Sequence, residues 1–193
     1  MNIEFIIPTY NSPDKLMLIL QSLVVQTDTN WTAHVIIDGM TNEYRQVKDI
    51  YQDNDKVRFS HIEGPNNDWG HTARNYGLDQ ATGLYVVMTG DDNYYVPTFV
   101  QEMLDATVDK PKMVMCNMVH NNAYGGYQVI DTAIKLSFID IGNVMYNTDA
   151  IGDLRLDKTD YNADYTFASE FVGKSIKSLN DIEKISKILY VHN

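Results

Sequence analysis

Short apolar runs and amphipathic segments alternate along residues 1–119 of the chain. Apolar side chains dominate the runs at 5–7, 33–37, 84–88 and 113–119, while residues 57–62 alternate between apolar and polar. Short apolar runs are typical of strands buried in a parallel sheet, and strict alternation is typical of a strand with one exposed face. We therefore predict a β-strand at each of these five positions.

Apolar residues at helical spacing separate the predicted strands. Ser12 is a predicted N-cap followed by Pro13 at the first helical position, and Thr41 and Pro97 are predicted to open two further helices. A loop and then a helix are predicted over residues 68–82, ended by Gly83. The inward faces of the other helices comprise Leu16, Leu20, Leu23 and Val24, then Tyr44, Val47 and Tyr51, then Phe99, Met103 and Leu104.

This βαβαβ order predicts an α/β fold, in which a mostly parallel, Rossmann-like sheet is flanked by helices and binds ligands at the carboxyl ends of its strands. The pattern weakens after residue 119, where only a turn at 124–127 and a helix at 161–173 are predicted. Nothing in the composition divides the chain. We expect one domain over 1–193, with a nucleotide-binding half (1–110) and an acceptor half (111–193).

Charge and composition restrict the partners. The formal net charge of −11 on 193 residues argues against a nucleic acid as the main partner, and an acidic protein that binds a diphosphate should also hold a divalent cation. The chain has one cysteine, Cys116, and no apolar run of the ~20 residues that a transmembrane segment needs. Residues 1–5 lack the basic start of a secretory signal, so we expect a cytoplasmic protein.

Asp91 and Asp92 follow the apolar run at 84–88 directly. Adjacent carboxylates at the end of a buried strand raise each other's pKa unless a cation compensates their charge. Mg²⁺ and Mn²⁺ take carboxylate and phosphate oxygens as ligands. The pair therefore indicates either a metal site or, as the simpler alternative, a solvated acidic turn.

Four short motifs stand in order at the predicted strand ends and in the helix between them. They are Pro-Thr-Tyr-Asn at 8–11, Asp-Gly at 38–39, Ala-Arg-Asn-Tyr-Gly-Leu at 73–78, and Asp-Asp-Asn at 91–93. In this order and spacing the chain resembles the family-2 glycosyltransferases of GT-A fold. The resemblance covers the first hundred residues well and extends more faintly to Asp164.

The resemblance implies an inverting glycosyltransferase that moves a sugar from a nucleotide diphosphate donor, a UDP-sugar by preference, to a glycan, lipid-linked or protein acceptor. It implies that Asp164 is the general base, that Asp91 and Asp92 hold Mn²⁺ or Mg²⁺, and that His192 either joins them or is a frayed terminal residue. The positions implied to bind the donor are Pro8, Thr9, Tyr10, Asp38, Arg74 and Asp91. Trp69 and the tyrosines form either a sugar-stacking platform or part of the core.

The chain departs from the family pattern at two places. Thr89 and Gly90 precede the acidic pair where the commoner motif has a further acid, and only Asp38 represents the two acids usual after the second strand. A non-catalytic sugar-nucleotide binding module is the alternative, because the acceptor half is short and its motif is the faintest. Because the glycine motifs of dehydrogenases and phosphate-loop NTPases are missing from the sequence, those classes are disfavoured.

Overall fold

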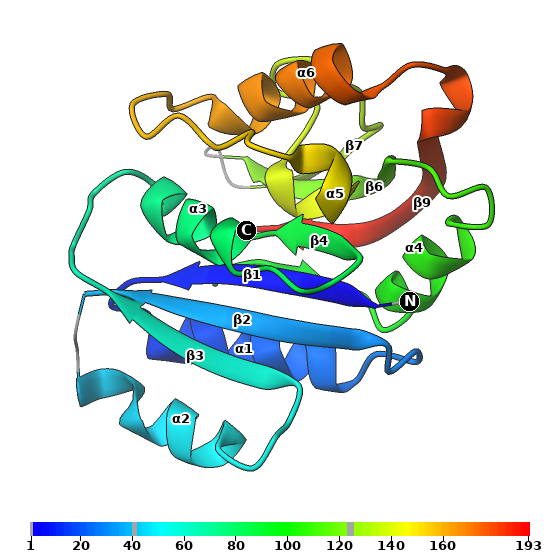
Figure 1. Ribbon diagram of the computed structural model, residues 1–193. Coiled ribbons are helices and arrows are strands. Elements are labelled where there is room, and N and C mark those ends of the chain that lie inside the picture. Colours follow the sequence, from blue (N-terminus) through cyan, green and yellow to red (C-terminus); the bar gives the residue numbers. More distant parts are fainter. Residues whose placement is uncertain (1, 40–41, 123–125) are drawn as a thin grey trace.

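A computed structural model of the chain describes residues 2–39, 42–122 and 126–193. Within these ranges one sheet of nine strands carries helices on both faces (Figure 1). The strands are β1 (Ile3–Thr9), β2 (Trp31–Asp38), β3 (Val57–Ile62), β4 (Tyr85–Met88), β5 (Tyr94–Tyr95), β6 (Met113–Asn122), β7 (Gly126–Ile130), β8 (Val144–Asn147) and β9 (Ile182–His192).

The sheet has the order β3-β2-β1-β4-β8-β6-β9-β5, with β7 paired to β6 outside this path. Strands β1 to β4 are mutually parallel, as the alternating pattern predicts. Strand β8 runs antiparallel to both β4 and β6, and β9 returns parallel to β6. The result is a mixed sheet in which the first four strands form the predicted parallel half.

Three of the described α-helices pack on each face of the sheet. The core of one face joins α1 (Pro13–Val24), α2 (Arg45–Tyr51) and α4 (Phe99–Asp105) to the sheet, and the core of the other joins α3 (His71–Asp79), α5 (Thr148–Ile151) and α6 (Ala163–Ser175). Short 3₁₀ turns occur at η1 (Asn42–Tyr44), η2 (Ile141–Asn143) and η3 (Leu179–Asp181). Side chains alternate along β1, because Phe5 and Ile7 enter the first core and Ile6 the second.

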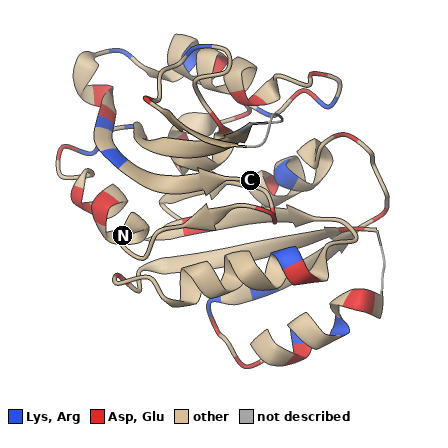
Figure 2. Ribbon diagram, turned by 180° about the vertical axis from the view of Figure 1, so that it is seen from behind, with Lys and Arg blue, Asp and Glu red and all other residues tan. Residues whose placement is uncertain are grey.

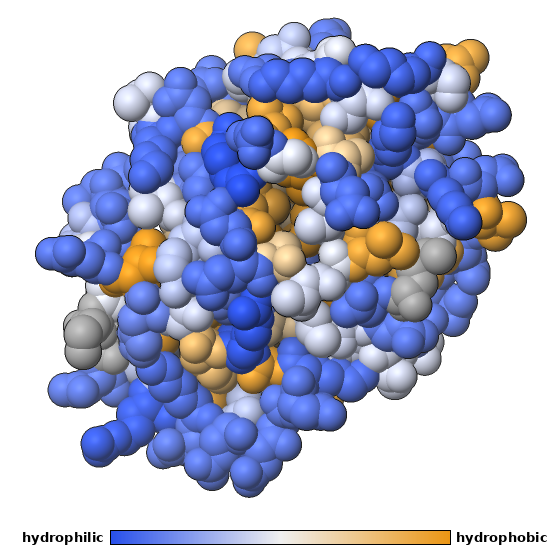
Figure 3. Space-filling view, viewed as in Figure 1, coloured by the Kyte–Doolittle hydropathy of each residue, from blue (hydrophilic) through white to orange (hydrophobic). Residues whose placement is uncertain are grey.

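Charged residues lie mainly on the helices and loops around the sheet (Figure 2). The face of the molecule shown in Figure 3 is largely hydrophilic, with smaller apolar areas among the hydrophilic side chains. Among the described residues no helix has the length and apolar character needed to span a membrane.

Two local predictions are wrong, and one is confirmed only in part. Ser12 is the N-cap residue of α1 and Pro13 its first residue, as predicted, but the Ser12 hydroxyl donates to the Tyr10 carbonyl and makes no capping hydrogen bond. Val24 is 52% exposed rather than packed inward. Gly83 does not end α3, whose C-cap is Gln80; it lies further on against β1, where an added Cβ would come within 2.8 Å of the Glu4 Cβ. The predicted cap Thr41 and the turn residues 124–125 lie outside the described residues.

Glu4 lies near the start of β1, at the opposite end of the parallel strands from the acidic pair, and holds the loop before β4. Its buried carboxylate accepts from Arg58 at 2.7 Å and from the backbone N–H groups of Thr82 and Gly83 at 2.7 and 2.8 Å. Burial opposes ionisation, but these donors outweigh it and lower the pKa of Glu4. The carboxylate therefore stabilises the fold above its unfolded pKa of about 4.3, and this contribution is lost as the pH falls through the folded value.

We expect Glu4→Gln to lower the free energy of unfolding at pH 7 by about 1–3 kcal/mol, since an amide cannot satisfy all of these donors. Urea unfolding measures the change. Lys174→Gln is the matched control, because it breaks only the exposed Lys174–Glu170 pair on α6. Equal midpoints for Glu4→Gln and the parent chain would contradict the assignment.

His34 makes stability depend on pH. The imidazole is fully buried in β2. Its Nε2 lies 2.7 Å from the Ser60 hydroxyl, and its Nδ1 has no partner in the described structure. Burial, reinforced by the Arg58 charge, lowers the pKa of His34 to about 4. Below pH ~6.5 His34 therefore becomes protonated in the unfolded chain but stays neutral in the folded chain. The free energy of unfolding falls as the pH drops toward the pKa of His34 in the folded chain.

We expect this one group to remove up to about 3 kcal/mol of stability between pH 6.5 and 4. Thermal unfolding followed across that range should show a steep decline for the parent chain and a shallower one for His34→Gln. Parallel curves for the two proteins would show that another group sets the pH dependence.

Candidate active site

Two adjoining cavities open where the parallel strands end. The β1 cavity, of about 440 Å³, is lined by the ends of β1 and β2 and by the loop after β4. The β6 cavity, of about 620 Å³, is lined by β6, β7, the segment before η2 and the start of α6. Five residues line both cavities: Trp69, Arg74, Gly90, Asp92 and His192. The two spaces therefore share one wall, at the position where the sequence predicts ligand binding.

A chain of hydrogen bonds fixes Asp91 in the β1 cavity. The Thr9 hydroxyl at the end of β1 donates to Asp91 Oδ2 at 2.6 Å and lies 2.8 Å from the Tyr44 hydroxyl, which accepts from the backbone N–H of Ser12. Since Thr9 gives its proton to the carboxylate, Tyr44 donates to Thr9. The predicted donor-site residue Thr9 thus holds the acidic pair in place.

Asp91 and Asp92 lie in different environments. Burial raises the pKa of Asp91 to about 6, and the Asp92 charge adds to the rise while the Thr9 hydrogen bond opposes it. Asp92 is more open, and its Oδ2 lies 3.5 Å from the half-exposed Lys15 ammonium. A cation beside the pair would favour the ionised form of both carboxylates.

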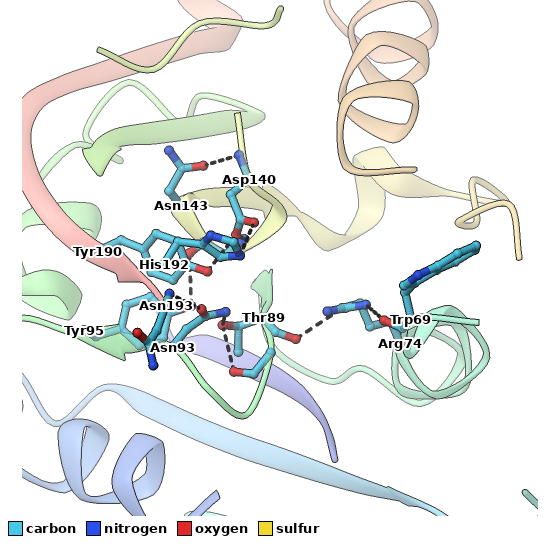
Figure 4. A network of polar contacts seen from close by, with 12 residues as sticks. Trp69, Arg74, Thr89, Asn93, Tyr95, Asp140, Asn143, Tyr190, His192 and Asn193 are labelled. Carbon is cyan, nitrogen blue, oxygen red and sulfur yellow. Dashed lines mark hydrogen bonds and ion pairs between the residues drawn. The ribbon is translucent and has the colours of Figure 1, made fainter. Parts of the chain in front are cut away.

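Arg74 is buried between the two cavities with its guanidinium anchored to backbone. Nε donates to the Thr89 carbonyl at 3.2 Å, and one terminal nitrogen donates to the Trp69 carbonyl at 2.7 Å (Figure 4). No carboxylate of the described residues lies within ion-pair distance of it. A buried, oriented and unpaired guanidinium is suited to an anionic ligand.

Asp38 ends β2 and is also buried in the β1 cavity. Its carboxylate accepts from the side-chain amide of Asn66 at 2.7 Å and from the Asn66 backbone N–H at 3.1 Å. These bonds tie the loop after β3 to the strand end. Among the described residues, Oδ2 accepts only from this backbone N–H and retains a lone pair for a further donor.

His192 is held in the last strand rather than frayed. It pairs with His120 in the register of β6 and β9, and the two rings lie 4.4 Å apart. Its Nε2 lies 3.4 Å from Asp140 Oδ2, while its buried Nδ1 has no partner in the described structure (Figure 4). The orphaned nitrogen therefore belongs to a ring that lines both cavities.

Asp140 organises the wall behind His192. Its Oδ1 accepts from the Tyr190 hydroxyl at 2.7 Å and from the Gly142 N–H at 2.8 Å, and its backbone N–H donates to Asn143 (Figure 4). A carboxylate beside the other nitrogen of a histidine is the usual outer partner of a metal-binding imidazole.

Asp164 lies in the first turn of α6 and lines the β6 cavity. Burial, with the Asp140 charge adding to it, raises the pKa of Asp164 to about 7, whereas Arg74 and the Ile141 N–H lower it. Its carboxylate has no side-chain hydrogen-bond partner among the described residues. A carboxylate that titrates near neutrality and faces a cavity is suited to accept a proton.

The residues around the acidic pair fit a divalent ion that a ligand helps to hold. No group of three His, Cys, Asp or Glu side chains in the described ranges is arranged to hold a metal by itself. Asp91 and Asp92 supply hard oxygen donors, and the His192 ring, whose Nδ1 is buried without a partner in the described structure, lines the same cavity. Mg²⁺ is commonly bound by one or two carboxylates together with substrate phosphates, which matches this incomplete set.

The structure brings the predicted site residues to these two cavities. Pro8, Thr9, Tyr10, Asp38, Arg74, Asp91, Asp92 and His192 line the β1 cavity, and Asp164 lines the β6 cavity. The sequence did not identify Tyr44, Tyr190 or Asp140 as site residues. The pattern places the two tyrosines in the core, and Asp140 belongs to no motif. His71 is the first residue of α3, and its Nε2 lies 3.2 Å from the Asp160 carbonyl oxygen.

The fold belongs to a known class. Over its whole length the chain superposes on the crystal structure of S. aureus TarS residues 1–349, with a TM-score of 0.82, 20% identity and 60% of that chain covered. It also matches TarS solved in complex with UDP-GlcNAc (TM-score 0.77, 22% identity, 99% of this chain and 58% of that chain). A mixed sheet of this form is the GT-A fold.

The family follows from the sequence comparison. Residues 4–168 match the model of glycosyl transferase family 2, and the chain belongs to this family. It is 32% identical over 117 residues to the uncharacterized glycosyltransferase YibD of Escherichia coli K12, covering 60% of this chain and 33% of that protein. The glycosyltransferase GlyA of Streptococcus pneumoniae serotype 4 is 30% identical over 111 residues, covering 55% and 16%. The chain thus spans a third or less of these two relatives.

Proposed function

We propose that the chain catalyses transfer of a sugar from a nucleoside diphosphate donor to an acceptor hydroxyl, with inversion at the anomeric carbon. The observation that carries the proposal is the arrangement of the two cavities. One places paired carboxylates beside a buried, unpaired guanidinium, and the adjoining one contains a carboxylate that titrates near neutrality.

The β1 cavity is assigned to the donor. Asp38 accepts the ring N–H of a uracil, and Arg74 donates its remaining N–H groups to the diphosphate. Pro8 and Tyr10 complete the wall beside the base. UDP as the nucleotide is supported by family membership and by the likeness to TarS, which has been solved with UDP and with UDP-GlcNAc.

Asp91 and Asp92 would hold Mn²⁺ or Mg²⁺ together with diphosphate oxygens, and His192 offers its Nδ1 from the same wall. A mannosyltransferase of similar fold, PcManGT of Pyrobaculum calidifontis, has been solved with GDP-Man and Mn²⁺ (TM-score 0.71, 14% identity). When bound, such an ion supplies Lewis-acid stabilisation of the negative charge on the leaving diphosphate.

The β6 cavity is assigned to the acceptor. An acceptor hydroxyl attacks the anomeric carbon while its proton passes to the Asp164 carboxylate. The bond between the anomeric carbon and the diphosphate oxygen breaks, and the nucleoside diphosphate leaves with the electron pair. Attack from the face opposite the leaving group inverts the anomeric centre, and Asp164 then releases the proton to solvent.

Titration calorimetry with UDP, with and without Mn²⁺, tests donor binding, and a UDP-GlcNAc hydrolysis assay tests turnover. We expect metal-dependent binding of UDP and slow donor hydrolysis in the absence of an acceptor. Binding without any hydrolysis or transfer would favour a non-catalytic sugar-nucleotide binding module. Failure to bind any nucleotide would overturn both.

The proposed setting is the cytoplasm, because a sequence with a single cysteine cannot form an internal disulfide and suits a reducing compartment. Cys116 is fully buried in β6, and burial raises the pKa of its thiol to about 12, so it is unreactive. The proposed acceptor is a glycan, a lipid-linked molecule or a protein.

A further inference from the structure

Trp69 is held in an unusual conformation at the wall between the cavities. Its φ is +56°, with Asn67 at +53° and Gly70 at +83° on either side. A bulky residue in the left-handed region costs free energy, and such positions cluster at ligand sites. The Trp69 carbonyl accepts from the buried Arg74 at 2.7 Å, which fixes the backbone in this state.

This conformation exposes the indole instead of burying it. Trp69 is 53% exposed, and its ring is directed away from Arg74 (Figure 4). Tyr161 packs edge-on against it, with ring centroids 5.5 Å apart and planes at 73°, and is itself 75% exposed. Both rings line the β6 cavity, and Tyr161 is three residues before Asp164. A preformed aromatic pair thus stands beside the proposed base.

The charges in the same cavity disfavour an anionic ligand. Asp92, Asp140 and Asp164 line it, and Arg74 is the one lysine or arginine among its described lining residues. Two of the donor groups of Arg74 are already taken by carbonyls, and the donor diphosphate would take the rest. Burial lowers the pKa of His71, so its ring adds no positive charge at pH 7.

We propose that the acceptor presents an uncharged sugar ring, which stacks on the Trp69–Tyr161 pair and turns a hydroxyl toward Asp164. Sugar rings have an apolar face of C–H groups, and exposed aromatic rings with a polar rim bind such faces well. An acidic polysaccharide or a phosphodiester polymer would meet the carboxylates of Asp140 and Asp164, while Asp92 would be engaged with the metal. This inference rests on the proposed function, because it takes the β6 cavity as the acceptor side.

The two tryptophans allow a direct test. Trp31 is 4% exposed in β2, so Trp31→Phe leaves Trp69 as the single emitter. This variant, saturated with UDP and Mn²⁺, is titrated with neutral saccharides (cellobiose, maltose, lactose, N,N′-diacetylchitobiose) and with glucuronic acid and glucose 6-phosphate. We expect at least one neutral saccharide to change Trp69 emission saturably, and the two anionic sugars to have no effect at equal concentration.

Tyr161→Ala should lower the affinity for that saccharide at least tenfold. The control Tyr127→Ala removes a 62% exposed ring outside both cavities and should leave this affinity unchanged. Calorimetry should show unchanged UDP binding in all of these proteins. The inference is overturned if UDP binds but no neutral saccharide alters the emission, if an anionic sugar binds more tightly, or if Tyr161→Ala has no effect. Loss of UDP binding in the parent chain would instead count against the proposed function.

Discussion

Asp164→Asn is expected to lower kcat by about 10²–10⁴-fold, the usual contribution of a positioned general base. The amide keeps the shape of the side chain and its place in the first turn of α6, but it cannot accept the proton of the acceptor hydroxyl. Binding of UDP in the presence of Mn²⁺ should be unchanged, since Asp164 does not line the β1 cavity. Steady-state kinetics and titration calorimetry measure the two quantities.

Glu170→Gln provides the control for this change. Glu170 lies on the same helix, pairs with Lys174 at 3.2 Å in solvent, and lines neither cavity. It loses the same charge and should turn over normally. A normal kcat for Asp164→Asn would show that another carboxylate is the base. Asp140 is the first to test, because it also lines the β6 cavity.

The pH profile gives an independent measure of the same role. The base must be ionised to act, and burial together with the Asp140 charge raises the pKa of Asp164 to about 7. The kcat/KM of the parent enzyme should therefore rise about tenfold per pH unit below that value and level off above it. The residual activity of Asp164→Asn should lack this acidic limb. A limb that persists in the variant would assign the titration to another group.

The parallel half of the fold could be predicted from sequence because its signals are local. Each strand from β1 to β4 is an apolar or alternating run, and a short motif follows β1, β2 and β4. Parallel strands bring their carboxyl ends to one edge, so Asp38 and Asp91 could be placed together without coordinates. The predicted donor-side residues line one cavity for this reason.

The second half could not be predicted because its pairings are distant in sequence. Strand β8 has four residues, and nothing local shows that it inserts antiparallel between β4 and β6. Strand β9 joins β6 across more than sixty residues with a register shift near Asn117. Asp140 acquires its role only through these pairings, which bring His192 and Tyr190 to it.

Side-chain contacts within the parallel half of the fold could not be predicted from the sequence either. Thr9 matched a donor-site motif, but its hydroxyl is shared between Asp91 and Tyr44, which are 82 and 35 residues away. Tyr44 read as a core residue, and it is indeed 1% exposed. Its hydroxyl nevertheless orients the acidic pair through Thr9. Periodicity identifies the buried face of a helix but not the partner of a polar atom on that face.

Asp92→Asn is expected to reduce kcat/KM by about 10²–10³-fold, equivalent to about 3–4 kcal/mol of transition-state stabilisation. Asp92 lines both cavities and is the more open of the two acids, so its carboxylate stands where, in the proposed function, the donor diphosphate would meet the acceptor. An amide oxygen is a weaker ligand for a hard divalent ion than a carboxylate. The variant should also lose most of the gain in UDP affinity that Mn²⁺ confers, which calorimetry measures without turnover.

Lys15→Met separates this role from the surface contact that Asp92 makes. The Lys15 ammonium lies 3.5 Å from Asp92 and is about half exposed, and pairs of this kind contribute about 0–1 kcal/mol. Removing the lysine should therefore leave Mn²⁺-dependent UDP binding intact. If Asp92→Asn bound UDP as tightly with Mn²⁺ as the parent chain, Asp92 would not be a metal ligand. Asp91→Asn would then decide whether its neighbour alone holds the ion, because the Thr9 hydroxyl can still donate to the amide oxygen and keep that side chain in place.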